Sequence, residues 1–408
     1  MASKWGRTLR KVAGKSPREI VRHAVARIAA RVDIDALEFP LRPDDIADSA
    51  LAAGSAPRPR GPGPLRVAWV VVPPGAGSGG HTTLFRMMDA VGRDGCVNTL
   101  VFYDRYAGDF EGNAETVRRH WPWLDCAIEP IEAGLDRYDV VVASSWPTAH
   151  VVARRLPAGV AGVYFIQDYE PYFFPRGSKY ALAEDSYRLG LHNVALGRMV
   201  AGELRAQLGL DAECVPFGCD TDIYRPPDPA VARSGVILYA KTRNDRRGYL
   251  LAKLALQHFH AAHPDEPIHV YGESPQDLEV PVIHHGNLSP DQLNTLYGTV
   301  RAGFALSFTN ISLVAEEMLS AGVIPVVNDS PMARADLANP HVVWATPTPR
   351  HLAEGLAAAV QRSRDEDALA NAVASSVHTA PWSHTGRMVS AIVQRVAAPA
   401  PAAEDRDD

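Results

Sequence analysis

The chain has 408 residues, a length that suits two domains of ordinary size better than one compact core. Its 46% hydrophobic and 22% charged residues are typical of a globular protein, and a net charge of −6 argues against a general nucleic-acid-binding protein. Four widely spaced cysteines without a CxxC pair fit neither a zinc site nor a disulfide framework. We find no apolar run long enough to span a bilayer and no signal-peptide pattern, so we expect a cytoplasmic protein.

The first 64 residues differ from the rest and are predicted to form a basic helical extension and a linker. Residues 1–32 hold nine basic residues against one acid, Glu19, with apolar residues at helical spacing. Two interpretations remain open. The helix lies on an anionic membrane, which would make the protein peripheral on the inner face of the cell membrane, or it docks its apolar stripe on the main body. Residues 52–64, rich in proline and glycine, indicate the linker.

Residues 65–225 are predicted to form a first α/β domain. Short apolar segments rich in β-branched residues alternate with helical patterns, which is typical of a parallel sheet covered by helices. The predicted strands lie at residues 65–73, 97–103, 138–144, 162–167 and 192–197, and the predicted helices at 84–92 and 198–208.

Residues 226–380 repeat this alternation and are predicted to form a second α/β domain. Its predicted strands lie at 235–241, 267–272, 303–308 and 323–328, and its helices at 247–260, 289–299 and 312–321. We expect a last helix within residues 381–398 to return to the first domain, and residues 399–408 to form a disordered tail. The predicted fold class is therefore α/β, with two Rossmann-like domains facing a cleft and ligands at the carboxyl ends of the strands.

A predicted helix start after strand 303–308 is suited to an anion. Its free backbone N–H groups and the helix dipole favour a phosphate beyond the end of the strand. Glu317 lies one turn further and could accept hydrogen bonds from paired hydroxyls, as on a ribose. The local pattern leaves equally open that Glu316 and Glu317 are ordinary surface residues of a helix. The residues at this helix start are Asn310, Ile311, Ser312 and Leu313.

A basic cluster directly follows predicted strand 235–241. Lysine and arginine at the end of a strand suit a diphosphate, especially in a domain that also offers a helix start. The alternative is a solubilising loop, although the position at a strand end favours the functional interpretation. The cluster consists of Lys241, Arg243, Arg246 and Arg247.

Two loops of the first domain also carry candidate site residues. The Gly-rich loop that contains Gly79, Gly80 and His81 is not a phosphate-binding Walker loop, because it lacks the GK[ST] signature. His81 fits a helix start that faces the cleft, or else a capping or packing role. In the second loop, Gln167 and Asp168 follow a predicted strand in an aromatic-rich segment. Asp168 could orient or deprotonate an acceptor hydroxyl, or merely cap a turn.

The order of these motifs resembles the GT-B glycosyltransferases of family 4 over roughly residues 65–398. VPFGCDTDIYRP (215–226) is similar to that family's interdomain signature, and SLVAEEMLSAG (312–322) to its nucleotide-sugar helix. The family's paired glutamates fall on Thr309 and Glu317, so the first of them is absent here. FIQDYEPYFFPRGSKYALAEDSY (165–187) resembles bacterial rhamnosyltransferases that build surface glycans.

The resemblance implies a role for each of these motifs. Lys241 and Arg247, with Arg246 as an alternative, would bind the donor diphosphate, and Glu317 its ribose. Gly79 and Gly80 of the acceptor-side domain would let the backbone approach the donor phosphate. The implied reaction is metal-independent transfer with retention, from dTDP-rhamnose to a glycan or lipid-linked glycan, without a cofactor. The alternatives are a non-catalytic nucleotide- or glycan-binding protein and a sugar-nucleotide epimerase of the same architecture.

Overall fold

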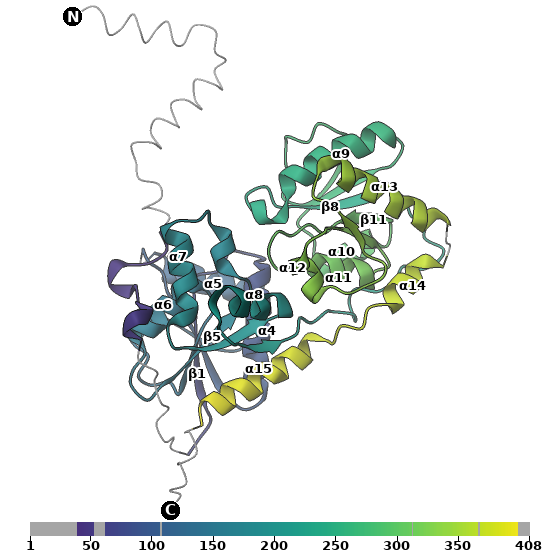
Figure 1. The fold of residues 1–408 in the computed structure, drawn as a ribbon. Helices are drawn as coiled ribbons and strands as arrows, with labels where there is room; N and C mark the ends of the chain where they lie inside the picture. The colour runs from purple at the N-terminus through teal and green to yellow at the C-terminus, as the bar shows by residue number, and fades with distance from the viewer. Residues whose placement is uncertain (1–38, 53–61, 107, 312, 366–367, 399–408) are drawn as a thin grey trace, which may run out of the picture. The chain divides into compact units, whose positions relative to one another are not determined.

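The computed structural model describes residues 39–52, 62–106, 108–311, 313–365 and 368–398 (Figure 1). The predicted basic helix over 1–32, most of the linker and the predicted tail over 399–408 lie outside the described residues. The chain divides into two compact units, Met1–Asp44 and Asp45–Asp408. In the first unit only residues 39–44 are described, and apart from a short 3-10 turn over Pro43–Asp45 all elements below belong to the second.

The first sheet of this unit has seven parallel strands in the order β3-β2-β1-β4-β5-β6-β7. Strand β1 pairs with β2 and β4, so that Trp69 lies opposite Leu100 on one side and Val142 on the other. Its residues from Val67 to Val71 are fully buried, as expected for a sheet with helices on both faces. The strands are β1 (Arg66–Val71), β2 (Val97–Phe102), β3 (Ala127–Pro130), β4 (Val140–Ala143), β5 (Ala161–Ile166), β6 (His192–Leu196) and β7 (Glu213–Val215).

Helices connect successive strands of this sheet. They are α4 (Gly79–Arg93), α5 (Phe110–His120), α6 (Trp146–Arg155), α7 (Ser178–Asp185) and α8 (Arg198–Leu208), with 3-10 turns η1 (Pro43–Asp45), η2 (Ser49–Leu51), η3 (Ile131–Ala133), η4 (Glu170–Phe173) and η5 (Ser186–Arg188). Helix α4 begins at Gly79, five residues before the predicted start. The glycine-rich segment therefore forms the first turn of the helix rather than a loop in front of it.

The second sheet has six parallel strands in the order β10-β9-β8-β11-β12-β13. Its strands are β8 (Val236–Ala240), β9 (Ile268–Gly272), β10 (Ile283–Gly286), β11 (Ala302–Phe304), β12 (Ile324–Asn328) and β13 (Val343–Ala345). The connecting helices are η6 (Asp245–Arg247), α9 (Tyr249–Ala262), α10 (Pro290–Tyr297), α11 (Leu313–Ser320), α12 (Pro331–Asp336), α13 (Pro349–Asp365) and α14 (Leu369–Ser375). Two parallel, helix-covered sheets confirm the predicted α/β fold class.

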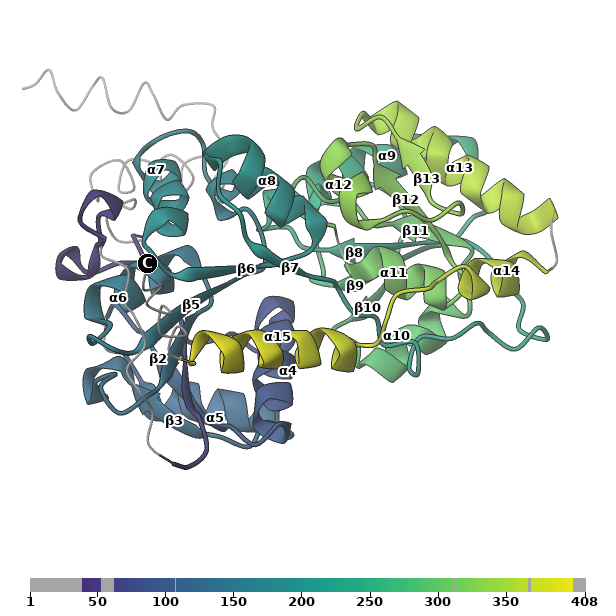
Figure 2. The ribbon, with the colours of Figure 1, turned by 60° about the horizontal axis from the view of Figure 1, so that its bottom comes forward.

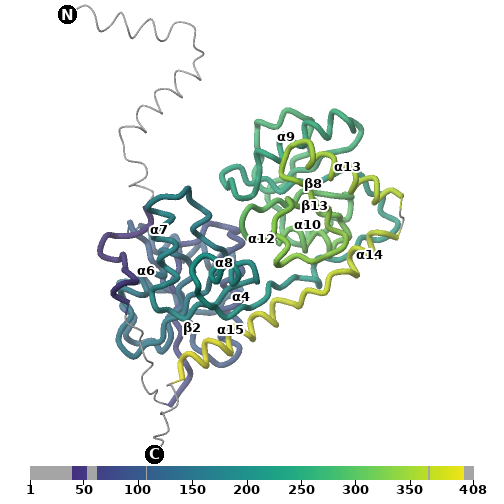
Figure 3. The backbone as a smooth tube through the Cα atoms, in the orientation of Figure 1, coloured from purple at the N-terminus to yellow at the C-terminus, as the bar shows by residue number. Residues whose placement is uncertain are grey.

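Helix α15 (Trp382–Val396) follows the second sheet in the chain but packs on helix α4 of the first sheet (Figure 2). The approach is close, because a Cβ atom on Gly386 would lie 2.5 Å from the Cβ of Ala90. Thr385 also donates a hydrogen bond of 2.9 Å to the carbonyl of Pro216. Figure 3 follows this path, with the chain passing from the first sheet to the second and returning through its yellow segment.

Strand β11 is shorter than predicted, because a side chain takes over the pairing that the ladder would have made. We expected a strand over 303–308, but the ladder ends at Phe304. Further along, the amide of Asn328 bonds both backbone groups of Ser307, at 2.8 and 2.7 Å. No described helix is long and apolar enough to cross a membrane.

Candidate functional site

The polar loops predicted to carry the site follow the carboxyl ends of β8 and β11 in the second sheet and of β1 and β5 in the first. In parallel sheets these ends are where ligands bind. Side chains from both sheets meet here, and the contacts are described loop by loop below.

Arg247 fixes the loop after β8 to the loop after β11. Its guanidinium donates to the Ser307 hydroxyl at 2.7 Å and to the Asn310 side-chain oxygen at 3.4 Å. Burial lowers the pKa of Arg247, an effect that the negative charge of Asp168 opposes. Gly248, the residue that follows, has a φ of +65°, and a Cβ atom there would lie 2.9 Å from the Phe308 ring. A glycine is therefore required at this turn into α9.

Arg246 contacts the first sheet directly. Its guanidinium donates to the Asp168 carboxylate at 2.8 Å and lies 3.7 Å from the centre of the Phe173 ring. Burial lowers the pKa of Arg246, while Asp168 raises it. A planar guanidinium held by a carboxylate and an aromatic face has a fixed orientation.

Asp168 is buried, with 5% of its surface exposed, and its carboxylate is surrounded by donors of the second sheet. Besides Arg246, it accepts hydrogen bonds from the Thr309 hydroxyl at 2.8 Å and the Asn310 backbone N–H at 3.3 Å. Burial raises the pKa of Asp168, and the two arginines oppose that effect. These three hydrogen bonds and the burial of the side chain restrict the access of an acceptor hydroxyl to this carboxylate.

The neighbouring residues complete the contact between the two loops. Asn310 donates from its side-chain nitrogen to the Gln167 carbonyl at 2.8 Å. Helix α11 begins at Leu313, directly after this contact, and Ile311 is buried. Ser312, which we predicted to offer a backbone N–H to a phosphate, lies outside the described residues.

Lys241 and Glu317 differ from the arginines in lacking a partner. The ammonium of Lys241 lies 5.2 Å from the centre of the Tyr239 ring and forms no ion pair within the described residues. The Glu317 carboxylate likewise has no hydrogen bond or ion pair there. Burial raises the pKa of Glu317 to about 7, with a further contribution from Asp220 and an opposing one from Arg86. A half-buried carboxylate without a partner is what a hydroxyl-bearing ligand would require.

Glu316 is not the exposed surface residue that the alternative interpretation described. Its side chain is partly buried, and one carboxylate oxygen is buried without a hydrogen-bond partner among the described residues. Burial raises the pKa of Glu316, and Thr379 lowers it. The two glutamates therefore lie in different surroundings, since Asp336 influences Glu316 whereas Asp220 and Arg86 influence Glu317.

In the Gly-rich segment of the first sheet, two glycines are exposed and the histidine that follows them is held by hydrogen bonds. Gly79 and Gly80 are exposed, and a Cβ atom on Gly80 would lie 3.7 Å from the side-chain oxygen of Gln167. The Nε2 of His81 lies 3.1 Å from the Val72 carbonyl, so this nitrogen carries the proton, and Nδ1 accepts from the Ser78 hydroxyl at 2.8 Å. Burial lowers the pKa of His81. Both ring nitrogens therefore hold the segment that leads into α4.

Sequence reasoning missed two carboxylates that link the sheets. Asp336, at the end of α12, accepts hydrogen bonds from the backbone N–H groups of Arg198 and Met199 at 2.7 and 2.9 Å. Helix α8 has Gly197 at its N-cap, which offers no side chain, so Asp336 caps it from the other sheet. Asp220, in the segment between the two sheets, accepts a hydrogen bond from Arg86 of α4 at 2.6 Å. The uncapped helix start was the signal for the first contact, and the sequence held none for the second.

Glu170 is a second buried carboxyl in the loop after β5. Its Oε2 accepts a hydrogen bond of 2.8 Å from the backbone N–H of Trp146, at the start of α6. Burial raises the pKa of Glu170 to about 8, so the side chain is mostly protonated at neutral pH. It holds the loop that presents Asp168 and Phe173.

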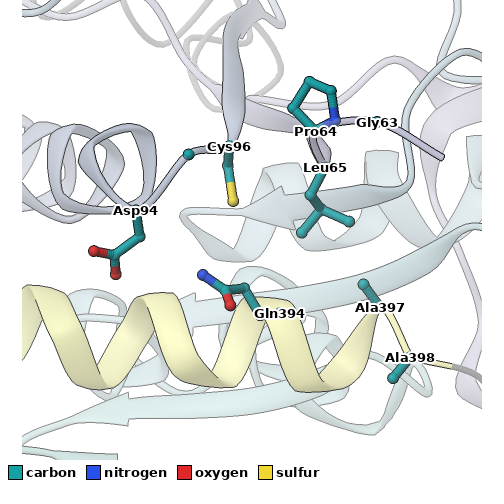
Figure 4. A pocket seen from close by; sticks show the side chains of 9 residues that line it. Gly63, Pro64, Leu65, Asp94, Cys96, Gln394, Ala397 and Ala398 are labelled. Atoms are coloured by element: carbon teal, nitrogen blue, oxygen red, sulfur yellow. The ribbon is translucent and has the colours of Figure 1, made fainter.

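A pocket of about 510 Å³ opens at the opposite edge of the first sheet, between the amino ends of β1 and β2 and helix α15 (Figure 4). Leu65, Cys96 and Gln394 line it together with Asp94 and small residues. It lies away from the loops that carry Asp168 and Gly80. Among the described residues, no group of three His, Cys, Asp or Glu side chains is placed to hold a metal ion.

Comparison with solved structures defines the class of fold. The crystal structure of Anabaena Alr3699/HepE in complex with UDP and glucose matches with a TM-score of 0.63 and 15% identity, over 81% of this chain and 100% of that one. WaaG, a glycosyltransferase involved in lipopolysaccharide biosynthesis, matches with a TM-score of 0.57 and 15% identity, over 80% and 99% of the two chains. The chain therefore has the GT-B fold of two Rossmann-like domains.

Sequence comparison gives the more particular likeness. Residues 131–198 match the family model described as WsaF, N-terminal domain, and residues 234–357 the one described as WsaF, C-terminal domain. The first segment contains Asp168, and the second contains the basic cluster and Glu317. The chain is also 28% identical over 387 residues to the O-antigen biosynthesis protein RfbC of Myxococcus xanthus. That alignment covers 88% of this chain but only 29% of RfbC, so the chain spans less than a third of that relative's length.

Proposed function

We propose that this protein is a glycosyltransferase that takes a sugar from a nucleoside-diphosphate donor bound to its second sheet. The observation that carries the proposal is the convergence of Lys241, Arg246 and Arg247 with the loop that leads into α11. Three cations and a helix start gather at the carboxyl ends of adjacent strands β8 and β11. This combination suits a diphosphate. The neighbour HepE, which was solved with UDP and glucose, supports a nucleotide-sugar ligand for this fold.

The chemistry assigned to these residues is stabilisation of the leaving group. When the bond between sugar and diphosphate breaks, negative charge develops on the diphosphate oxygens. Fixed cations and backbone N–H groups stabilise that charge without reorganisation, and they act more strongly in a buried site than in water. Arg246 and Arg247 are already oriented by Phe173, Ser307 and Asn310. We propose that transfer needs no metal ion and retains the anomeric configuration, as the resemblance to family 4 implies.

For the donor we propose dTDP-rhamnose, and for the acceptor a hydroxyl of a bacterial surface glycan, free or lipid-linked. The resemblance of residues 165–187 to surface-glycan rhamnosyltransferases supports the donor, and the similarity to an O-antigen biosynthesis protein supports the acceptor. Glu317 would bind the ribose hydroxyls. Gln167, Asp168 and His81 remain the candidates on the acceptor side.

The test is turnover of a panel of nucleotide sugars by the purified full chain. Release of the nucleoside diphosphate, followed by chromatography, should be fastest with dTDP-rhamnose and should accelerate with a glycan acceptor. Isomerised nucleotide sugar without acceptor dependence would point to an epimerase instead. Binding of nucleoside diphosphates with no release or transfer would point to a non-catalytic binding protein.

A further inference from the structure

The carboxylate of Asp168 occupies a position where three donors of the second sheet converge. These donors are the Arg246 guanidinium at 2.8 Å, the Thr309 hydroxyl at 2.8 Å and the Asn310 backbone N–H at 3.3 Å. They come from the ends of strands β8 and β11, whereas Asp168 comes from the end of β5 in the first sheet. A cation, a hydroxyl and a backbone N–H are also the groups that bind a phosphoryl oxygen.

The surroundings of the Asp168 carboxylate in the second sheet also resemble an anion-binding site. Arg247 lies close enough to affect the Asp168 charge, and helix α11 begins three residues after Asn310. The positive end of the helix dipole therefore faces the same region as the two guanidinium groups. Within the described residues, Asp168 is the one carboxylate of the first sheet that accepts hydrogen bonds from these donors, although the charge of Glu170 also acts on Arg246.

We propose that Asp168 is an internal competitor of the donor, with its carboxylate occupying a phosphoryl-oxygen position of the diphosphate site in the donor-free protein. This proposal rests on the proposed function. A nucleoside diphosphate gains Arg246, Thr309 and Asn310 only when Asp168 withdraws. The observed affinity is then lower than the intrinsic affinity by the fraction of molecules in which the carboxylate has left.

The competition also couples the donor site to the loop that carries the acceptor-side candidates. Asp168 directly follows Gln167, whose carbonyl accepts a hydrogen bond from Asn310 at 2.8 Å. It also lies just before the η4 turn, which places the Phe173 ring against Arg246. Withdrawal of Asp168 would release these contacts together. Donor binding would therefore free the loop over 167–174 and expose a carboxylate that now accepts three hydrogen bonds.

The test is the affinity of Asp168→Asn for dTDP and UDP, measured by calorimetry on the full chain. Asparagine keeps the size of the side chain but removes its charge, so it competes poorly for Arg246. We expect the variant to bind the nucleoside diphosphate that wild type prefers about tenfold more tightly. This corresponds to about 1.4 kcal/mol of binding free energy. A residue that contacts the donor, or one that only supports the fold, would give weaker binding on substitution.

Asp336→Asn is the matched control. Asp336 is also a buried carboxylate that joins the two sheets, but its partners are the N–H groups of Arg198 and Met199 rather than the basic cluster. If both variants tighten binding equally, looser contact between the sheets is the cause and the competition is overturned. Unchanged or weaker binding by Asp168→Asn, with wild type binding normally, also overturns it while leaving the proposed function intact.

Hydrogen exchange on wild type gives a second measurement that needs no variant. Saturating dTDP should speed amide exchange in a peptide over 167–174, because the contacts of Asp168 and Gln167 are lost. Slower exchange there, in a sample that binds dTDP, contradicts the competition even if Asp168→Asn fails to fold. If wild type binds no nucleoside diphosphate at all, it is the proposed function that fails.

Discussion

Arg86 and Asp220 form an ion pair of 2.6 Å that joins helix α4 of the first sheet to the segment that leads into the second. The Arg86 guanidinium also lies 5.2 Å from the centre of the Trp382 ring, at the start of α15. Both members of the pair influence the charge of Glu317. The half-buried carboxylate of Glu317, which forms no hydrogen bond or ion pair with the described residues, thus lies where α11 approaches elements of the first sheet. These surroundings distinguish it from Glu316.

Glu317→Ala should weaken dTDP binding by about 1.5–3 kcal/mol, the usual scale for hydrogen bonds to a charged group. That corresponds to roughly a 10- to 150-fold rise in Kd, measurable by calorimetry. The control is Glu316→Ala, one residue along the same helix, which should change Kd little. A general loss of α11 would affect both variants alike. If Glu316→Ala abolishes binding and Glu317→Ala does not, the ribose is assigned to the wrong glutamate.

Glu317→Gln should change the pH dependence of stability. The pKa of Glu317 is raised to about 7 from 4.5, so between these values the folded protein binds the proton more tightly than the unfolded chain. The wild-type free energy of unfolding therefore falls as pH rises through this window, and glutamine removes that fall. We expect the free energy of unfolding of the variant to exceed that of wild type by about 1–2 kcal/mol at pH 8 and not at pH 4.5. The figure at pH 8 is reduced because the Glu317 side chain is partly exposed to solvent. Urea unfolding at the two pH values measures this, and an equal difference at both would contradict it.

The strand-to-loop pattern predicted the second-sheet half of the site. The segments after β8 and β11 are polar, and the carboxyl ends of parallel strands meet at one edge of a sheet. The approach of Arg247 to Asn310 could therefore be expected from sequence. Strands β3, β7, β10 and β13 escaped prediction, because short edge strands lack a continuous apolar run.

The contacts between the two sheets could not be predicted. Arg246 and Asp168 are 78 residues apart, and Arg86 and Asp220 are 134 apart, so no local spacing relates them. Their pairing depends on how α15 and the connecting segment pack, which is decided by the whole fold. His81 illustrates the same limit, since the sequence places it at a helix start but does not show that its two ring nitrogens contact Ser78 and Val72.

Lys241→Met should separate binding from stability. The lysine makes no ion pair within the described residues, so its loss should leave the free energy of unfolding within about 0.5 kcal/mol of wild type. If it binds the donor diphosphate, the free energy of dTDP binding should become less favourable by about 1.5–3 kcal/mol. That corresponds to roughly a 10- to 150-fold rise in Kd. Arg243→Met, an exposed residue of the same basic cluster, is the control and should bind normally. Equal losses in the two variants would indicate a general effect of charge rather than a specific contact.

The nucleotide preference can be measured as ligand-induced stabilisation. We expect dTDP to stabilise the protein more than ADP or GDP at equal concentration, because the proposed donor is a thymidine nucleotide. A ligand present at 100 times its Kd contributes about 2.7 kcal/mol, which thermal unfolding readily detects. Greater stabilisation by ADP or GDP would remove the rhamnosyl assignment and leave the GT-B fold untouched.

Gly303→Ala should destabilise the second sheet, because the core leaves no room for a methyl group at this position of β11. A Cβ atom on Gly303 would lie 2.5 Å from the Ile237 side chain, 2.7 Å from the Ile237 carbonyl and 2.8 Å from Met318. Two of these contacts belong to the adjacent strand β8, so relief requires β11 to move away from it. Overpacking of this kind costs about 1–3 kcal/mol. Because β11 leads into the loop that holds Thr309 and Asn310, dTDP affinity should fall as well.

The control is Gly202→Ala in helix α8, where a Cβ atom would meet nothing within 4 Å. Alanine in a helix interior is favoured over glycine by about 1 kcal/mol, so this variant should be more stable than wild type. Urea unfolding of the two variants should therefore shift the midpoint in opposite directions. If Gly303→Ala unfolds at the wild-type midpoint, β11 is free to move relative to β8. The packing that we infer to hold the loop in front of α11 would then be wrong.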